Sequence, residues 1–353
     1  MSNIVRLPGI IDIHVHLRDP GQTQKEDFYT GTCTALAGGV TAIFDMPNNL
    51  EPIFSSQKLE EKIEIARQKA VCDYGLYFGT DGENISQFKK VSDKVVGLKV
   101  YLSLTTGKYV IGDEELVEKV FREWPREKII VVHAEGDRVD LAIRLAEKYN
   151  NKLHITHIST QESLEKIIEA KKNKLNITCD TAPHYLFLTT DDLSKLGNLG
   201  IVKPPLGSKK DKEFLWSNID KIDCIVSDHA PHTLNDKEGK PTPAGLPGLE
   251  TTLSLLLTAM NQDRLSLRDL IRLTNINPQK IFGYYQDKKT FVEVDNSEKY
   301  IIENKNLKTK CGWSPFNGWQ MQGKVKAVYI RNIKVFENDK LLASPGFGKQ
   351  VIS

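Results

Sequence analysis

Residues 128–158, KIIVVHAEGDRVDLAIRLAEKYNNKLHITHI, contain the repeating unit that decides the fold. Two short apolar runs, 128–134 and 152–158, stand on either side of an amphipathic stretch at 137–149. This pattern is typical of two buried strands joined by a helix. Because a helical crossover joins parallel strands, the unit predicts a piece of parallel sheet that is buried on both faces.

The same unit recurs along most of the chain. Further strand-like runs are GIIDIHV (9–15), VTAIFDM (40–46), CDYGLYFG (72–79), VVGLKVYL (95–102), LNITCDT (175–181) and DCIVSD (223–228). Helix-like segments lie between most of these runs, as at 55–70, 113–123 and 160–172. Eight apolar strands that are mostly separated by helices predict an α/β protein with a (β/α)8 TIM barrel. A doubly wound open sheet is the alternative architecture.

After about residue 285 the sequence no longer alternates strand-like and helix-like segments. The segments TFVEVDN, KYIIEN, GKVKAVYIRN and IKVFEND alternate or run in a β-like manner and are separated by turns. We therefore expect a barrel over residues 7–285, with its last helices at 264–283. A small β-rich subdomain would consist of residues 286–353 together with residues 1–6.

Composition narrows the class of protein. Among 353 residues, 48 Lys and Arg stand against 46 Asp and Glu, and a net charge of +2 gives little support to a nucleic-acid partner. The apolar runs are too short and too often broken for a membrane span, and no signal segment opens the chain. Five scattered cysteines without a CxxC pair are typical of reduced thiols in a cytoplasmic protein. They are Cys33, Cys72, Cys179, Cys224 and Cys311.

Polar side chains follow the predicted strands at the point where each strand ends. In chain order they are His14, His16, Asn48, Lys99, His133, His157 and Asp228. The carboxyl ends of barrel strands converge on one mouth, where active sites form. A single histidine there is more often structural than a ligand. Four histidines, an aspartate and a lysine at successive strand ends together favour a metal site.

The residue types indicate which metal and how many ions. Histidine nitrogens with a carboxylate suit zinc, and a catalytic zinc keeps one position open. Four histidines and one aspartate exceed the three protein ligands of one catalytic zinc, so we expect two ions. Lys99, the only charge in VVGLKVYL, has no lone pair as an ammonium. Carbamylation by carbon dioxide would turn Lys99 into an anionic carbamate that can bridge both ions.

Eight short motifs together resemble one family. They are DIHVHLRDPG, DMPN, GLKVYL, VHAE, HITHIST, APHYLFL, SDHAPH and GLPGLET. In this order they resemble the dihydroorotases of the amidohydrolase superfamily, over residues 7–285. A weaker likeness to the animal multifunctional-type dihydroorotases continues through the tail. Each motif by itself is unspecific, and the ordered set is specific.

The resemblance implies a ligand set and a reaction. Two zinc ions per subunit would be held by His14, His16, Lys99 as N6-carboxylysine, and Asp228, and by Lys99, His133 and His157. The implied reaction is the reversible cyclisation of N-carbamoyl-L-aspartate to L-dihydroorotate in de novo pyrimidine biosynthesis. A metal-bridging hydroxide would attack the ring carbonyl, with Asp228 as the general acid and base.

The resemblance also implies how the substrate is bound. It assigns substrate contacts to Arg18, Asn48, His232, Ala244 and Gly245, and lid contacts to Thr105 and Thr106 in the loop 103–112. The planar fork of an arginine matches a carboxylate, so Arg18 is suited to the acid group of dihydroorotate. A small, polar, glycine-bearing loop over the mouth is typical of a mobile lid.

Three positions depart from the family pattern. Thr156 stands where many relatives have Cys, Asp180 where many have Glu, and Tyr185 where many have a second His. All three are expected beside the metals, so the tuning of the site and any third metal stay open.

Other functions remain as alternatives. The chain can be another cyclic amidase, such as an allantoinase or a dihydropyrimidinase (hydantoinase), although Arg18 and Asn48 favour a substrate with a carboxylate. An inactive dihydroorotase-like scaffold subunit is the alternative outside enzymes, and the intact ligand set speaks against it. The sequence does not decide between a homo-oligomer and a complex with aspartate transcarbamylase.

Overall fold

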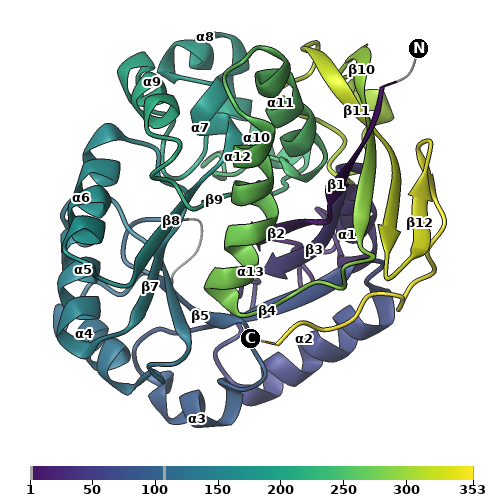
Figure 1. Cartoon of the computed structure of the whole chain (residues 1–353). Helices are drawn as coiled ribbons and strands as arrows, with labels where there is room; N and C mark the ends of the chain where they lie inside the picture. Colours follow the sequence, from purple (N-terminus) through teal and green to yellow (C-terminus); the bar gives the residue numbers. More distant parts are fainter. Residues whose placement is uncertain (1–2, 106–108, 353) are drawn as a thin grey trace.

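The computed structural model describes residues 3–105 and 109–352, and its largest sheet is a parallel barrel (Figure 1). Its strands pair in chain order, each parallel to the next. They are β2 (Ile10–Val15), β3 (Val40–Asp45), β4 (Asp73–Gly79), β5 (Gly97–Tyr101), β6 (Ile129–His133), β7 (Lys152–Ile155), β8 (Ile177–Thr181) and β9 (Cys224–Ile225). An isolated parallel bridge between Val15 and His229 closes the circle, and the predicted (β/α)8 barrel is confirmed.

Helices surround the barrel in Figure 1. The longer ones are α1 (Phe28–Ala37), α2 (Ser56–Lys69), α4 (Glu114–Glu123), α5 (Asp137–Tyr149), α6 (Gln161–Lys172), α9 (Lys209–Ser217) and α11 (Leu249–Asn261). Shorter ones are α3 (Phe88–Val91), α7 (Pro183–Phe187), α8 (Leu193–Leu196), α10 (Leu234–Glu238), α12 (Leu267–Ile271) and α13 (Asn277–Phe282). Single turns are η1 (Asn84–Gln87), η2 (Thr190–Asp192), η3 (Gly197–Gly200), η4 (Arg272–Ile276) and η5 (Asn304–Asn306).

Local signals explain where the predicted helices begin. The side chain of Asp113 accepts hydrogen bonds from the N–H groups of Glu115 and Leu116, so α4 begins directly after it. Thr160 caps α6 in the same way, through the N–H of Ser163. Capping side chains satisfy backbone donors that have no partner inside the helix.

An apolar cluster fills part of the barrel interior. It joins side chains of strands that are not neighbours, including Ile13 of β2, Phe44 of β3 and Val131 of β6, so it lies inside the sheet. Phe282 at the end of α13 closes this cluster, with its ring 5.2 Å from that of Phe44 and 6.1 Å from that of Tyr77. The mouth of such a barrel lies at the carboxyl ends of its strands.

Strand β2 changes register just before the mouth. Ile13 belongs to the inner cluster, and strict alternation would turn the next residue, His14, toward the helices. The pairing of β2 with β3 shifts between Asp12 and Val15, and Asp12 accepts a hydrogen bond from the N–H of His14. The shift works as a β-bulge, which keeps both Ile13 and His14 inside the barrel.

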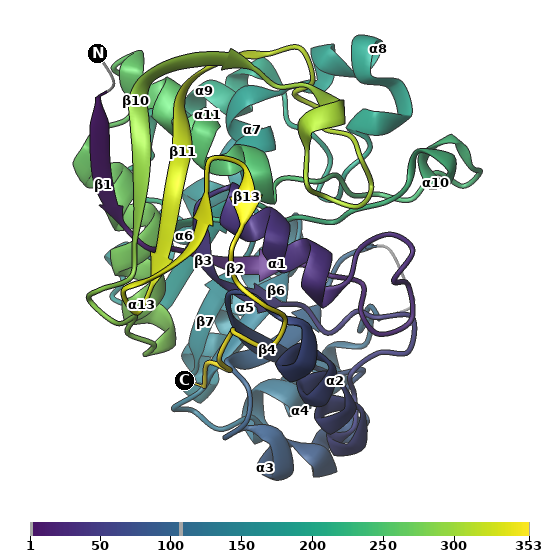
Figure 2. The ribbon, with the colours of Figure 1, turned by 90° about the vertical axis from the view of Figure 1, so that its right-hand side faces the viewer.

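A second, antiparallel sheet stands at one flank of the barrel (Figure 2). Its strands are β1 (Ile4–Pro8), β10 (Phe291–Ile301), β11 (Gln320–Ile330), β12 (Ile333–Glu337) and β13 (Lys340–Leu341), in this order across the sheet. TFVEVDN and KYIIEN, which read as two segments, join in the one strand β10 across a register shift. The division of the chain into domains at residue 285 stays a prediction.

Among residues 3–105 and 109–352, no helix combines the length and the apolar character that a membrane crossing requires.

Candidate metal and substrate site

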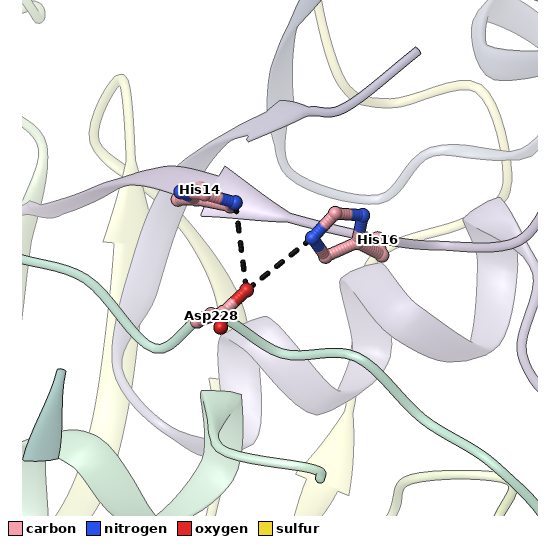
Figure 3. Close-up of side chains that lie close together, drawn as sticks. All are labelled: His14, His16 and Asp228. Carbon is pink, nitrogen blue, oxygen red and sulfur yellow. Dashed lines mark ion pairs between the residues drawn. The ribbon is translucent and has the colours of Figure 1, made fainter. Parts of the chain in front are cut away.

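Two histidines and an aspartate meet at the mouth of the barrel (Figure 3). One carboxylate oxygen of Asp228, which follows β9, lies 3.4 Å from Nε2 of His14 and 3.3 Å from Nε2 of His16. The three side chains are buried, and their candidate ligand atoms all lie within 4.8 Å of one another. Strands β2 and β9 are far apart in sequence and are brought together by the closing bridge.

The other predicted ligands converge beside this trio. Nδ1 of His133, at the end of β6, lies 3.0 Å from Nε2 of His157, which follows β7. The ring centroids of His14 and His157 are 5.1 Å apart, so the two groups share one space. Lys99 of β5 is fully buried, and its ammonium donates a hydrogen bond to the hydroxyl of Thr156 at 3.2 Å. Burial lowers the pKa of Lys99 to about 7, against the opposing charges of Asp180 and Asp228.

The histidines have the chemistry of metal ligands. Burial is the first cause that lowers the pKa of His14, His16, His133 and His157, so these imidazoles are neutral near pH 7. Neutral imidazole is the form that binds metal. Nδ1 of His16 lies 2.6 Å from the amide oxygen of Asn48, which places the proton on Nδ1 and frees Nε2. The donor set therefore fits a zinc centre.

Buried carboxylates fix the backbone under the ligands. Asp12 accepts hydrogen bonds from the N–H of His14 at 3.1 Å and from that of Ser227 at 3.0 Å. Asp180 accepts from the N–H of His157 at 2.5 Å and lies 2.7 Å from Nε2 of His154. Burial raises the pKa of Asp12 to about 7. These bonds tie the chain next to Asp228 and next to His157 to the barrel interior.

The predicted substrate residues gather on one side of the mouth. Arg18 is buried, and its Nε donates to the carbonyl oxygen of Pro231 at 3.2 Å. Its second terminal nitrogen lies 3.2 Å from Nε2 of His232. The same ring nitrogen lies 3.2 Å from the carbonyl oxygen of Ala244. Gly245 has φ of +136°, and a Cβ there would lie 2.6 Å from the carbonyl oxygen of Ala230.

One cavity joins the two halves of the site. It is lined by His14, His16, Arg18, Asn48, Tyr101, Thr105, His133, His157, Val202, Lys203, Asp228, Ala230, Ala244 and Gly245. Thr105 is thus placed at the mouth, whereas Thr106 lies outside the described residues. His232 stands behind Arg18 and does not line the cavity.

A larger hollow of about 380 Å³ lies between α11 and the second sheet, but its lining contains no histidine. We therefore choose the smaller cavity as the candidate site, because metal-ligand side chains line it.

Several site residues were missed by sequence reasoning. Lys203 and Tyr101 line the cavity, and Lys25 lies 3.1 Å from Nδ1 of His232. Burial lowers the pKa of His184 to about 4, while Asp228 raises it. His184 stands in the quoted motif APHYLFL, which was the only sequence signal for it. Lys25 gave no signal, because its partner is 207 positions away.

The three departures from the family pattern have separate contacts. The hydroxyl of Thr156 accepts from Lys99, and Asp180 holds His157 as described. The hydroxyl of Tyr185 donates to the carbonyl oxygen of Pro204 at 2.7 Å. Thr156 and Asp180 therefore touch predicted ligands, whereas the hydroxyl of Tyr185 is engaged by the chain itself.

Comparisons with known proteins agree with this geometry. A model of the amidohydrolase family matches residues 5–293. The multifunctional protein CAD of Squalus acanthias is 40% identical over 349 residues, which are 99% of this chain and 16% of that protein. A dihydroorotase of Pyrococcus abyssi is 36% identical over 362 residues, covering 96% of this chain and 85% of that enzyme. The solved L-hydantoinase (dihydropyrimidinase) of Arthrobacter aurescens has a TM-score of 0.94 at 26% identity, over 99% of this chain and 89% of that one.

These matches define the class first. A parallel barrel with histidines and an aspartate at its mouth, matched by the family model over most of its length, is an amidohydrolase. The chain belongs to the amidohydrolase family, and within that family to the dihydroorotases. It spans about one sixth of the multifunctional relative that it matches.

Proposed function

We propose that the chain is a zinc-dependent dihydroorotase that interconverts N-carbamoyl-L-aspartate and L-dihydroorotate. One observation carries the proposal: a buried arginine opens into the same cavity as two converging groups of metal-ligand side chains. A cyclic amide with a carboxylate fits both halves of this cavity. The dihydroorotase relatives of similar length support the same choice.

The proposal includes two metal positions. His14, His16 and Asp228 would hold one zinc, and His133 with His157 the other. Lys99, as N6-carboxylysine, would supply an oxygen to each. When bound, the zinc pair would supply Lewis acidity to the amide carbonyl and to water. Burial lowers the pKa of Lys99 and so favours the neutral amine, whose lone pair attacks the carbon of carbon dioxide; the nitrogen then loses a proton to give the anionic carbamate.

Asp228 is the proposed general acid and base. Its carboxylate lines the cavity and is positioned by a backbone with φ of 45°, next to Ser227, which Asp12 holds. In ring opening, Asp228 takes the proton of the attacking water at a carboxylate oxygen. It then gives this proton to the amide nitrogen as the C–N bond breaks, and the cycle returns the carboxylate unchanged.

Arg18 is the proposed partner of the substrate carboxylate. Its guanidinium is almost fully buried, and a charge-assisted hydrogen bond is strongest where water is excluded. Asn48 and the backbone of Ala244 and Gly245 complete the proposed contacts around the ring. Thr105 and Thr106 remain the proposed lid contacts.

Turnover with a metal chelator tests this proposal directly. Purified protein should convert both dihydroorotate and N-carbamoyl-aspartate, lose both activities in a chelator, and regain them with zinc. Absence of turnover in zinc-loaded protein would refute the assignment and would favour the inactive scaffold.

A second candidate is a hydantoinase or dihydropyrimidinase, which the superposition on the Arthrobacter aurescens enzyme favours. Substrates of that class offer the cyclic amide without the acid group of dihydroorotate. A panel of dihydroorotate, dihydrouracil and hydantoin separates the two candidates. A kcat/KM for hydantoin or dihydrouracil above that for dihydroorotate would reverse our choice.

We also propose a cytoplasmic location and a role in pyrimidine biosynthesis. All five cysteines are free thiols, which suits a reducing compartment. The multifunctional relatives suggest association with further chains, either a second copy or an aspartate transcarbamylase. Size-exclusion chromatography with and without the transcarbamylase measures both.

A further inference from the structure

We propose that Lys25 is a positioning residue that fixes the tautomer of His232 and thereby keeps Arg18 available for the substrate carboxylate. Lys25 lies in the turn that follows the first predicted ligands, and 8% of its surface is exposed. The part that concerns the carboxylate rests on the proposed function. The part that concerns the tautomer rests on contacts within the chain alone.

The contact between Lys25 and His232 has only one hydrogen-bonding arrangement. Nζ of Lys25 lies 3.1 Å from Nδ1 of His232, in a buried position. Burial lowers the pKa of Lys25, whereas a carboxylate oxygen of Asp236, 3.7 Å from the same Nζ, raises it and favours the ammonium form. Because an ammonium has only donors, Nδ1 of His232 must accept. The ring proton of a neutral His232 is therefore on Nε2.

His232 is neutral, as this reasoning requires. Burial is the main cause that lowers its pKa to about 2, and the charges of Arg18, Lys25 and Lys237 add to it. A single proton then sits on one of the two ring nitrogens. Lys25 decides which nitrogen it is.

The position of this proton sets the role of Arg18. With the proton on Nε2, His232 donates to the carbonyl oxygen of Ala244 at 3.2 Å and holds the loop that lines the cavity. Nε2 then has no lone pair for the Arg18 nitrogen that lies 3.2 Å away. This N–H group of Arg18 needs an acceptor from elsewhere, and a substrate carboxylate in the cavity supplies one.

If His232 carried its proton on Nδ1 instead, the N–H group of Arg18 would not be available to the substrate. Nε2 would accept a hydrogen bond from Arg18, and the carbonyl oxygen of Ala244 would face a lone pair. Arg18 would then be engaged by its own protein, and binding a carboxylate would first require breaking that bond. Lys25 thus contributes to affinity for the acid group without contacting it.

Nitrogen-15 NMR of histidine-labelled, zinc-loaded protein tests the tautomer. The chain has eight histidines, and His232→Gln identifies the signal of His232. We expect a protonated Nε2 in the natural chain and in Lys25→Arg, and a substantial Nδ1-protonated population in Lys25→Met. An unchanged Nε2 proton in Lys25→Met overturns the proposal. If Lys25→Met does not fold, Lys25→Leu, which also has no donor, serves for the same measurement.

Kinetics test the consequence for the substrate. In Lys25→Met, KM for dihydroorotate should rise about tenfold with kcat nearly unchanged, because a buried hydrogen-bonding partner is lost from binding alone. Lys25→Arg should restore most of the affinity, since it can also donate to Nδ1. A fall in kcat with unchanged KM would contradict the assignment.

Lys310→Met is the matched control. Nζ of Lys310 donates to the carbonyl oxygen of Thr23 and lies 3.0 Å from Asp27, so it anchors the same turn without touching His232. If Lys310→Met raises KM as much as Lys25→Met, anchoring of the turn explains the effect and the proposal fails. The NMR result remains informative even if the protein turns over a different amide, so failure of the proposed function is distinguishable.

Discussion

Arg18, His157 and Asp228 present their side chains from left-handed backbones, with φ of 64°, 43° and 45°. A non-glycine residue in this region costs on the order of 1–3 kcal/mol and persists only where its surroundings enforce it. Here the enforcing contacts are visible: Asp180 binds the N–H of His157, and Asp12 binds the N–H of Ser227, next to Asp228. The backbones of His157 and Asp228 are therefore held by buried carboxylates that bind neighbouring N–H groups.

Replacement of Arg18 by Met tests substrate recognition at this scale. We expect KM for dihydroorotate to rise by about one hundredfold or more, because a buried charged hydrogen-bonding partner is removed. Activity toward dihydrouracil, which has no carboxylate, should change little. Steady-state kinetics with both substrates measure this, and an unchanged KM for dihydroorotate would argue against a carboxylate-binding role.

Individual site residues differ in how predictable they were. His14, His133 and His157 each end an apolar run, so the pattern placed them at the mouth, and the structure brings them together there. Lys25 was not predictable, because its role depends on a contact with His232 across 207 positions. A contact that is formed only by the closed barrel leaves no periodic signal in the sequence.

At the scale of elements, the strands and helices of the barrel were largely predictable, and details of register were not. The stretch 137–149 is helix α5 to the residue, since its apolar side recurs at helical spacing. The predicted strand 223–228 pairs as a strand only over Cys224–Ile225. Nor does alternation reveal the register shift in β2, which turns His14 inward.

Contact between β11 and α11 leads to a test of packing. Gly323 has φ of +104°, and a Cβ there would lie 2.7 Å from Cβ of Leu257. Gly318 has φ of +83° with open space around it. Gly318→Ala should lower the free energy of unfolding by about 1 kcal/mol, and Gly323→Ala by about 2–4 kcal/mol, because strain and overpacking add. Urea denaturation measures both, and equal losses would show that packing against Leu257 is loose.

Glu250 in the first turn of α11 gives a prediction for pH. Burial raises its pKa to about 7, although the N–H of Lys308 donates to its carboxylate at 2.7 Å. In an unfolded chain Glu250 ionises near pH 4.5, so its contribution to stability is complete below pH 4.5 and is lost as pH rises to about 7. Between these values the free energy of unfolding should fall by about 1–3 kcal/mol more in the natural chain than in Glu250→Gln. Denaturation midpoints at several pH values measure the difference, and parallel curves would contradict it.

At the scale of the whole molecule, the predicted barrel is confirmed because its signal is repeated in every unit. Each strand–helix pair carries the same pattern, so errors at single boundaries do not alter the topology. The pairing of β1 with β10 was less visible, since β1 is short and its partner is far along the chain.

Metal removal should destabilise the molecule as a whole. The proposed ligands come from strands or loops around the full barrel, so zinc would bind the folded state and not the unfolded chain. We expect a chelator to lower the thermal midpoint by several degrees and zinc to restore it. Differential scanning calorimetry measures this shift. An identical thermal midpoint with and without chelator would show that zinc does not stabilise the fold.

The pairing of β1 with β10 also has a consequence for synthesis on the ribosome. Arg6 of β1 bonds to Glu293 of β10, 287 positions later in the chain. At roughly 5–20 residues per second, β1 emerges on the order of 15–60 s before its partner exists. An edge of unpaired backbone is exposed throughout this interval, and such edges promote aggregation. Strand β1 therefore stays without its sheet partner until β10 has been synthesised, 287 positions later.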